Sequence, residues 1–289
     1  MRSSLRMGPL ALTAPAAVAF LLFLAAPLAA FFVFSFLTAL PFSVSGPLTI
    51  DSYREAVTSS LNGILARNSL IVGLLSACAT VGVALPVAYW IRYRAGRWAV
   101  PVLFLITATM FASYLVRVYA WRTILGRNGV VNQALDALGL IERPLDFLIF
   151  SRFAITVALV HIFLPYVILV LYAGLRPLTP ALLDSAQDLG ANAFMRWRRV
   201  VLPLVAAPAV TAFFFVFILS ASDYVTPQFL GGTGSVMLGV RIQDSFKATG
   251  NWPEGAAISF LMLAAFVVLY GLTALGLRTA RLDRIRWGS

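Results

Sequence analysis

The sequence has little charge. Of its 289 residues, 11% are charged and 61% are hydrophobic, and the mean hydropathy is +0.90. A soluble domain has about 25% charged residues, so water is not the main solvent of this chain. The net charge of +11 does not indicate a nucleic-acid-binding protein, because the arginines lie between apolar runs instead of clustering on a polar face. The composition predicts a membrane protein.

Cysteine, histidine and lysine each occur once, as Cys78, His161 and Lys247. One cysteine excludes an internal disulfide, and one histidine with one cysteine excludes the common zinc sites. Lys247 lies outside any Gly-x-x-x-x-Gly-Lys motif, so the chain lacks that type of ATP site. No Gly-x-Ser-x-Gly motif supports an intramembrane hydrolase. We therefore expect no catalytic residue, metal or cofactor in this chain, and we interpret Cys78 as a small buried residue.

Six long charge-free runs are each sufficient to cross a membrane, which takes about 20 apolar helical residues. The predicted spans are residues 12–40, 68–91, 98–117, 153–175, 203–222 and 255–277. The first run is too long for a signal peptide, whose apolar part has about 7–15 residues, so we expect this helix to be retained. The fold class predicted is an all-α polytopic membrane protein, with a single transmembrane domain over residues 1–289.

Arginine is unevenly distributed between the two sides of these spans. With the N-terminus in the cytoplasm, the internal segments hold 13 arginines and only 3 acidic residues, whereas the external segments are nearly neutral. Because basic residues favour cytoplasmic segments, both termini are predicted to be cytoplasmic. Residues 118–152 and 223–254 are then external, and because irregular backbone cannot face lipid, we expect them to line an external mouth or a water-filled vestibule. We interpret Gly231–Gly234 as a flexible turn there.

The internal segment 176–203 predicts two short helices joined by a sharp turn. Thr179 and Pro180 are typical of a helix start, and Gly190 of a helix end, which bounds a helix at Ala181–Leu189. Asn192 is a suitable cap for a second helix over Ala193–Val201. The segment predicts a compact helix–turn–helix on the cytoplasmic face.

This segment resembles the EAA loop of binding-protein-dependent ABC permeases. That loop has Glu-Ala-Ala, three residues, glycine, nine residues, Ile, any residue and Leu-Pro. Here Asp184 replaces the glutamate, Ser185 the first alanine and Val200 the isoleucine, while the glycine, the spacing and the Leu-Pro match. The positions that carry the resemblance are Asp184, Ser185, Ala186, Gly190, Leu202 and Pro203.

The resemblance implies a type I ABC importer (MetI-like) permease fold in the bacterial inner membrane. The loop would be the coupling helix that docks on a separate ATPase dimer, which binds the ATP and magnesium. The other implied partners are a soluble solute-binding protein and a second permease subunit, which is either a homologous sister chain or an identical copy. A secondary transporter stays open as an alternative, although such proteins often have internal repeats, and we find none here.

Further segments resemble polyamine (spermidine/putrescine) permeases, whose relatives also carry other small organic solutes, such as amino-acid-like or opine-like ones. These segments are Leu115–Trp121, Gly129–Asn132, Leu164–Tyr166, Ser222–Pro227 and Asn251–Ala257. A polycation on a low-dielectric pathway favours carboxylates and aromatic rings. Asp223, Tyr224 and Glu254 are therefore candidates for the substrate pathway. Asp223 has the alternative role of ordering its loop by hydrogen bonding.

Two basic side chains within the spans have alternative roles. His161 is either a solute or proton contact, or an interhelical hydrogen-bonding group beside Pro165. Arg117 would oppose a cation in the pathway, so we expect it to be anchored to backbone carbonyls.

Overall fold

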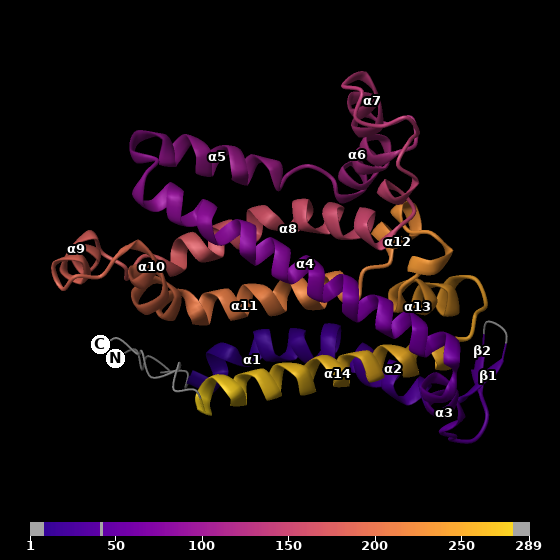
Figure 1. Cartoon of the computed structure of the whole chain (residues 1–289). Helices are drawn as coiled ribbons and strands as arrows, with labels where there is room; N and C mark the ends of the chain where they lie inside the picture. Colours follow the sequence, from indigo (N-terminus) through magenta and orange to yellow (C-terminus); the bar gives the residue numbers. More distant parts are fainter. Residues whose placement is uncertain (1–8, 41–42, 280–289) are drawn as a thin grey trace, which may run out of the picture. The chain divides into compact units, whose positions relative to one another are not determined.

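The computed structural model describes residues 9–40 and 43–279, which are almost entirely helical (Figure 1). The α-helices are α1 (Pro9–Phe20), α2 (Ala26–Phe34), α3 (Asp51–Thr58), α4 (Ser60–Tyr93), α5 (Ala99–Thr109), α6 (Tyr114–Leu125), α7 (Val130–Ala137), α8 (Arg152–Gly174), α9 (Pro180–Asp188), α10 (Ala193–Arg196), α11 (Leu202–Ala221), α12 (Val225–Leu230), α13 (Leu238–Lys247) and α14 (Trp252–Thr279). The strands β1 (Thr38–Leu40) and β2 (Ser43–Ser45) pair antiparallel. The all-α prediction is confirmed, apart from this small hairpin.

Five helical stretches of the described residues are long and apolar enough to cross a membrane: Thr13–Phe34, Ser60–Tyr93, Arg152–Gly174, Ala193–Ala221 and Trp252–Thr273. A bent pair, Gly96–Thr109 with Tyr114–Ala137, supplies a sixth crossing if it counts as one span. The chain is therefore a multi-pass membrane protein. Both termini are predicted to be cytoplasmic, but residues 1–8 and 280–289 lie outside the described residues.

The third span differs from its prediction as one helix over residues 98–117. α5 ends at Thr109, and α6 begins at Tyr114 at an angle of 93° to it. Ser113 has an extended backbone with ψ of 140°, which stops helix propagation. The amides of Met110, Phe111 and Ala112 bond to carbonyls three residues back, as in a tightened helix end. Hydropathy reports apolar character and not direction, so it could not reveal this bend.

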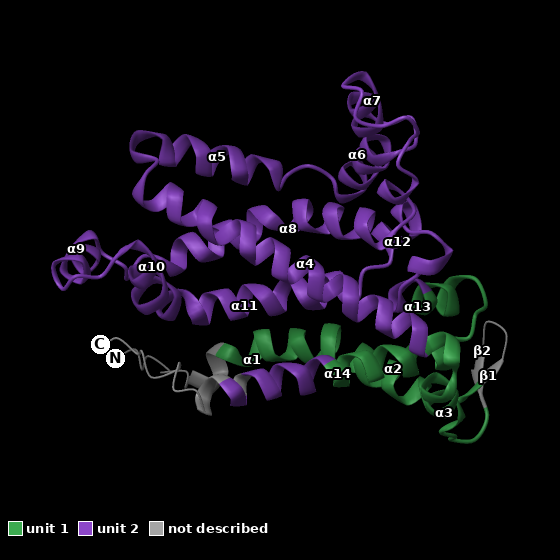
Figure 2. Ribbon diagram, in the orientation of Figure 1, with its two compact units in different colours: residues 1–62, 241–265 green, residues 63–240, 266–289 purple. Residues whose placement is uncertain are grey.

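The chain divides into two compact units (Figure 2). One consists of residues 1–62 with 241–265, and the other of residues 63–240 with 266–289. All three boundaries fall inside helices, namely α4, α13 and α14, whereas domain boundaries usually fall in exposed linkers. The single transmembrane domain stays a prediction that this division does not test.

Aromatic side chains organise the smaller unit. Phe32 packs edge-on against Phe260 of α14, and Phe31 packs in the same way against Phe246 of α13. Ser35 at the end of α2 is fully buried and shares a 2.8 Å hydrogen bond with Tyr53 of α3. These contacts join the end of the first span to α3, α13 and α14.

In the larger unit, α8 and α11 lie side by side (Figure 1). A Cβ atom at Gly174 would lie 2.6 Å from Cγ of Pro208, so the two helices approach as closely as a glycine allows. α4 uses the same device against α11, because a Cβ atom at Gly73 would lie 2.8 Å from that of Ala221. Small residues allow such close packing in membranes, where helix association depends on van der Waals contact.

Two smaller predictions are wrong. Cys78 is exposed on α4 and not buried, because an apolar run does not reveal which helix face meets the core. The segment Gly231–Gly234 is not a flexible turn. Ser235 is 3% exposed and donates to the Gly232 carbonyl, and Asn68 of α4 donates to the Gly234 carbonyl at 3.2 Å. These glycines allow close backbone approach, which the sequence cannot distinguish from mobility.

Replacing Gly174 by valine should lower the free energy of unfolding by about 1–3 kcal/mol, because the new side chain overlaps Pro208. Thermal unfolding of the detergent-solubilised protein measures the effect. Gly82→Val is the matched control, since a Cβ atom at Gly82 in α4 meets nothing within 4 Å. Equal unfolding temperatures for the two variants would contradict the proposed α8–α11 contact.

Candidate functional site

The helix α9 begins as its sequence predicts. The side-chain oxygen of Thr179 accepts a 3.4 Å hydrogen bond from the Leu182 amide, and Pro180 occupies the first helical position. Proline lacks an amide hydrogen, which this position does not need. The start of the turn is therefore fixed by local chemistry alone.

Gly190 ends α9 in a left-handed conformation, with φ of +81°. Its amide donates to the Gln187 carbonyl at 2.8 Å, and the Ala191 amide donates to the Ala186 carbonyl at 3.0 Å. This pair of bonds is a Schellman motif, which satisfies carbonyls at the helix end. A Cβ atom at Gly190 would meet nothing within 4 Å, so the backbone angle and not space requires the glycine.

The second helix of the turn runs directly into the fifth span. Asn192 caps it by accepting a 2.8 Å hydrogen bond from the Met195 amide, and the helical stretch then continues from Ala193 to Ala221. Residues Trp197–Val201 form a π-helical segment just before Pro203. Proline disrupts a regular helix, and a π segment is one way to accommodate it. We predicted a short helix over Ala193–Val201 and a separate fifth span, but the structure has one continuous helical stretch over Ala193–Ala221.

A side-chain hydrogen bond braces the two arms of the turn. Arg196 Nη1 donates to Gln187 Oε1 at 2.9 Å. Beyond this brace, Leu189 is 88% exposed and Phe194 is 74% exposed. α9 extends past the ends of α8 and α11 (Figure 1). The turn thus presents an apolar tip, defined as Leu189 and Phe194, which the sequence analysis missed.

The predicted coupling residues occupy this turn. Asp184, Ser185 and Ala186 lie on α9, Gly190 is its left-handed end, and Leu202 with Pro203 begins α11. Ser185 Oγ donates to the Ala181 carbonyl at 2.8 Å, so its hydroxyl is used within the helix. Asp184 is exposed and forms no ion pair within the described residues. The turn brings all these positions to one end of the larger unit.

Asp223 is held by hydrogen bonds at the start of α12. Its carboxylate accepts from the amides of Val225 and Thr226, both at 3.1 Å, and from the Tyr114 hydroxyl at 2.9 Å. Burial raises the pKa of Asp223 above its ordinary value, while bonds from Thr226, Tyr114 and the backbone oppose that shift. The carboxylate caps α12 and ties it to α6, as the alternative role of ordering the loop requires.

Glu254 is also engaged within the chain. It is 5% exposed, pairs with Arg241 of α13 and accepts a 3.0 Å hydrogen bond from Asn251. The Glu254 amide donates in turn to Asn251 Oδ1 at 3.1 Å, which caps α14. Tyr224 is 40% exposed. Asp223 and Tyr224 are adjacent, whereas Glu254 belongs to the other unit.

The profile of a protein family described as "Binding-protein-dependent transport system inner membrane component" matches residues 31–286, which include parts of both units. The chain belongs to this family. It is therefore a permease subunit of an ABC importer, with an importer permease fold.

Individual relatives agree with this assignment. The permease is 29% identical to the spermidine/putrescine transport system permease protein PotB of Haemophilus influenzae over 230 residues, covering 78% of this chain and 79% of the relative. It is 30% identical to the inner membrane ABC transporter permease protein YdcU of Escherichia coli K12 over 239 residues, covering 79% and 75%.

Two solved structures show the fold. A bacterial ABC transporter that imports the acidic polysaccharide alginate contains a chain with a TM-score of 0.76 and 18% identity, covering 96% of this permease and 95% of that chain. The alginate transporter in complex with a periplasmic protein bound to an alginate pentasaccharide gives a TM-score of 0.77 at 18% identity, covering 93% of each chain. At this identity the likeness concerns the fold alone.

The end of α4 anchors the turn between α9 and α10, and the sequence did not predict this contact. The Tyr93 hydroxyl donates to the Leu178 carbonyl at 2.5 Å and to the Leu175 carbonyl at 3.2 Å, where α8 ends. The Tyr89 ring lies 4.9 Å from that of Trp197 in the π segment. Both arms of the turn therefore contact α4. A tyrosine four residues from another is the only sequence signal for this anchor, and it is not a specific one.

The basic side chains within the spans have the structural contacts that we expected. Arg117 Nη1 donates to the Ile162 carbonyl at 3.3 Å, and Trp121 Nε1 donates to His161 Nδ1 at 3.1 Å. Both bonds join α6 to α8. The interhelical hydrogen bond predicted for His161 is confirmed, with Trp121 as the partner that the sequence did not identify.

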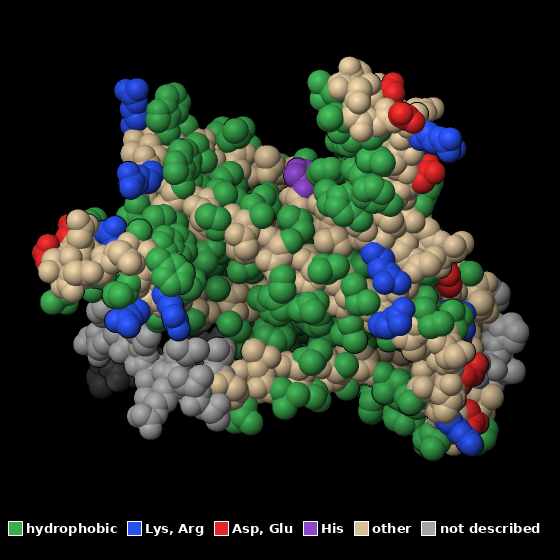
Figure 3. Space-filling view, viewed as in Figure 1, with side chains coloured by type: hydrophobic (Ala, Val, Ile, Leu, Met, Phe, Trp, Pro, Cys, Tyr) green, Lys and Arg blue, Asp and Glu red, His purple; other side chains and the backbone are tan. Residues whose placement is uncertain are grey.

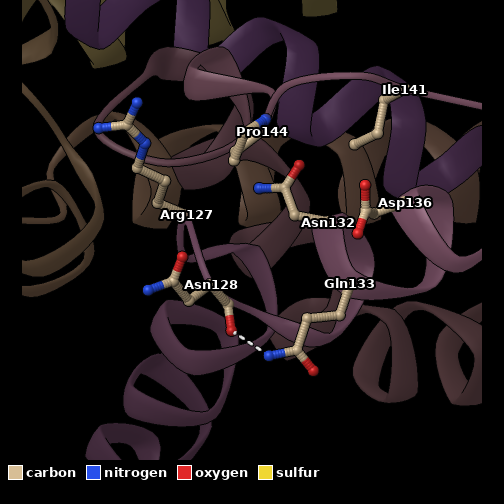
Figure 4. Close-up of a pocket in the computed structure, with 7 residues that line it drawn as sticks. All are labelled: Arg127, Asn128, Asn132, Gln133, Asp136, Ile141 and Pro144. Carbon is tan, nitrogen blue, oxygen red and sulfur yellow. Dashed lines mark hydrogen bonds between the residues drawn. The ribbon is translucent and has the colours of Figure 1, made fainter.

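A polar pocket of about 230 Å³ lies in the segment that follows α6 (Figure 4). Asn132 in its wall accepts from the Leu145 amide at 2.8 Å and donates to the Gly126 carbonyl at 3.1 Å. Gln133 donates to the Asn128 carbonyl at 2.9 Å, the bond drawn in Figure 4. The side-chain amides of Asn132 and Gln133 hydrogen-bond to the backbone of this segment, so the pocket results from the folding of the segment.

Gly190→Asn should retain more ATPase coupling than Gly190→Val, because asparagine tolerates a positive φ and valine does not. The left-handed conformation costs an ordinary residue about 1–2 kcal/mol. Stimulation of ATP hydrolysis by the loaded binding protein, measured on the reconstituted importer, ranks the variants. Equal retention by both variants would show that the backbone angle is not the constraint.

Asp223→Ala should lower the free energy of unfolding by about 0.5–2 kcal/mol through loss of the cap, whereas Asp223→Asn keeps an acceptor oxygen and loses less. Thermal unfolding in detergent measures both. Asp136→Ala is the control, because the Asp136 side chain is exposed. If Asp223→Ala unfolds like this control, the capping role is wrong.

Proposed function

We propose that this permease imports a polyamine, such as spermidine or putrescine, or a related small cationic solute. The observation that carries the coupling role is the turn that joins α9 through Gly190 to one continuous helix entering the fifth span. The solute is supported by the relatives named as spermidine/putrescine permeases and by the sequence segments similar to that subfamily. Asp223 and Tyr224 stay candidates for receiving the solute at the external mouth.

The coupling step follows from the rigidity of this turn. Its apolar tip fits a groove on a separate ATPase subunit, where burial of Leu189 and Phe194 favours docking. When two ATPase subunits close on ATP and magnesium, α9 moves with them. The brace between Arg196 and Gln187 and the continuous helix Ala193–Ala221 transmit that movement to the fifth span. The permease pair then alternates between inward-open and outward-open states.

The complete importer contains partners that supply what this chain lacks. A homologous second permease completes the pathway, and a soluble binding protein delivers the solute from outside. The location is a bacterial inner membrane with both termini in the cytoplasm. Hydrolysis of ATP takes place in the ATPase subunits.

A second candidate is a permease of the same class for another small organic solute, amino-acid-like or opine-like. It is favoured because the carboxylates of Asp223 and Glu254 already have hydrogen-bonding or ionic partners within the chain. Asp223 caps α12 and Glu254 pairs with Arg241, so neither is held free for a cation.

Cells that express all four components should accumulate labelled spermidine and putrescine with this permease and should fail with Gly190→Val, because a β-branched side chain does not tolerate the positive φ at this position. Uptake with and without metabolic energy is the measurement. If neither polyamine accumulates while the loaded binding protein still stimulates ATP hydrolysis, the permease role stands and the polyamine assignment is wrong.

The double variant Leu189→Ser with Phe194→Ser tests docking in the same cells. It should abolish uptake and co-purification of the ATPase, because it removes the apolar tip. The matched control is Leu138→Ser with Leu140→Ser, two exposed leucines that the arginine distribution places on the external side. Loss of the ATPase in both double variants would indicate general destabilisation.

A further inference from the structure

His161 is exposed near the middle of the fourth span. It lies roughly 14 Å along α8 from Arg152, at 1.5 Å per residue. Figure 3 shows the histidine, in purple, at the surface between α5 and α6. Because Nδ1 accepts from Trp121, the neutral imidazole carries its proton on Nε2. An N–H group that faced hydrocarbon would lack a partner and cost several kcal/mol. This face of α8 is therefore not a lipid-facing one.

The break in the third span lies beside this histidine. Residues 110–113 separate α5 from α6, and Arg117, one turn into α6, bonds to α8 at Ile162. Phe111 in the break is 87% exposed, so the rest of this chain does not cover it. Non-helical backbone at membrane depth occurs where protein buries it or where it lines a water-filled cavity. The exposed imidazole and the broken span point independently to such a cavity.

A hollow continues from the break along α8. It has a volume of about 330 Å³, and its walls include Met110 of the break, Tyr166 of α8 and Thr211 of α11. Tyr166 lies five residues beyond His161 on α8, which places it about 140° around the helix from His161. The hollow therefore adjoins the broken span on a different face of α8 from His161.

We propose that His161 and Trp121 line the water-filled solute pathway at mid-membrane depth, with Val157, His161 and Leu164 forming one wall. This proposal rests on the permease class and not on the identity of the solute. The spacing of these three residues places them on one helical face. The wall offers a solute one N–H donor and the aromatic surface of Trp121.

The wall provides no counter-charge for a cation. α5, α6, α8 and α11 contain no aspartate or glutamate, whereas Arg117 lies beside the wall. A small hydrated organic amine can pass with its alkyl segments against Trp121 and its ammonium groups in water. The wall therefore lets such a solute through without holding its charge, and strong capture is left to the binding protein.

A cysteine scan of the assembled importer tests the wall. The natural cysteine is first removed by Cys78→Ala. Single cysteines then replace Val157, Ala158, Leu159, His161, Ile162 and Leu164, and a membrane-impermeant methanethiosulfonate reagent is added on both sides, with and without ATP. The positions 157, 161 and 164 should react, whereas 158, 159 and 162 should not, because those side chains are at most 2% exposed.

Val267→Cys is the lipid-facing control, since Val267 is 63% exposed on an apolar stretch of α14. Reaction at position 161 should be at least about tenfold faster than at 267, because the reactive thiolate forms in water and not in hydrocarbon. Absence of reaction at 157, 161 and 164 in both nucleotide states would overturn the proposal. Reaction at positions 158, 159 and 162 as fast as at 157, 161 and 164 would also overturn the proposal. Failure of spermidine uptake would leave the expected pattern unchanged.

The charge of the wall is tested with two reagents of similar size at Leu164→Cys. The anionic reagent should react at least as fast as the cationic one, because Arg117 is near and the surrounding helices have no carboxylate. A clear preference for the cationic reagent would show that a counter-charge lines the pathway and would overturn this part of the proposal.

Discussion

Membrane protein backbones must satisfy their own hydrogen bonds, because the bilayer core offers no water, and this constraint underlies each irregular feature of the permease. Pro203 is accommodated by a π-helical segment, which keeps the helix continuous from the coupling turn into the fifth span. The amides of residues 110–112 bond to carbonyls three residues back where the third span breaks. At the break in the third span, local bonds thus replace part of the helical bonding that is lost.

The larger unit contains one helix that continues into the fifth span and one span that is broken, and we propose a different role for each. At the turn between α9 and α10, which we propose as the coupling element, three contacts stiffen the backbone: the Schellman motif at Gly190, the brace from Arg196 and the anchor from Tyr93. A stiff lever transmits displacement instead of absorbing it. Elsewhere in this unit, the broken span and the exposed His161 lie where we propose the solute pathway. Both regions belong to the larger unit.

The two carboxylates predicted to lie on the solute pathway, Asp223 and Glu254, have structural partners within the chain. Asp223 and Glu254 are prominent because acidic residues are scarce in this chain. Each caps a helix or joins one to a neighbour: Asp223 holds α12 to α6, and Glu254 joins α13 to α14. A buried carboxylate needs such partners whatever its function, so composition alone cannot separate a solute contact from a structural cap.

Local chemistry determined the parts of this protein that the sequence could predict. Apolar runs, the cap at Thr179, the glycine at a positive φ and the cap at Asn192 act within a few residues, so their positions could be read directly. The tertiary structure alone decided the bend at residues 110–113, the exposure of Cys78 and the pairing of Trp121 with His161. These depend on which helix faces meet, and hydropathy measures how apolar a segment is without specifying the direction of its side chains or its neighbour.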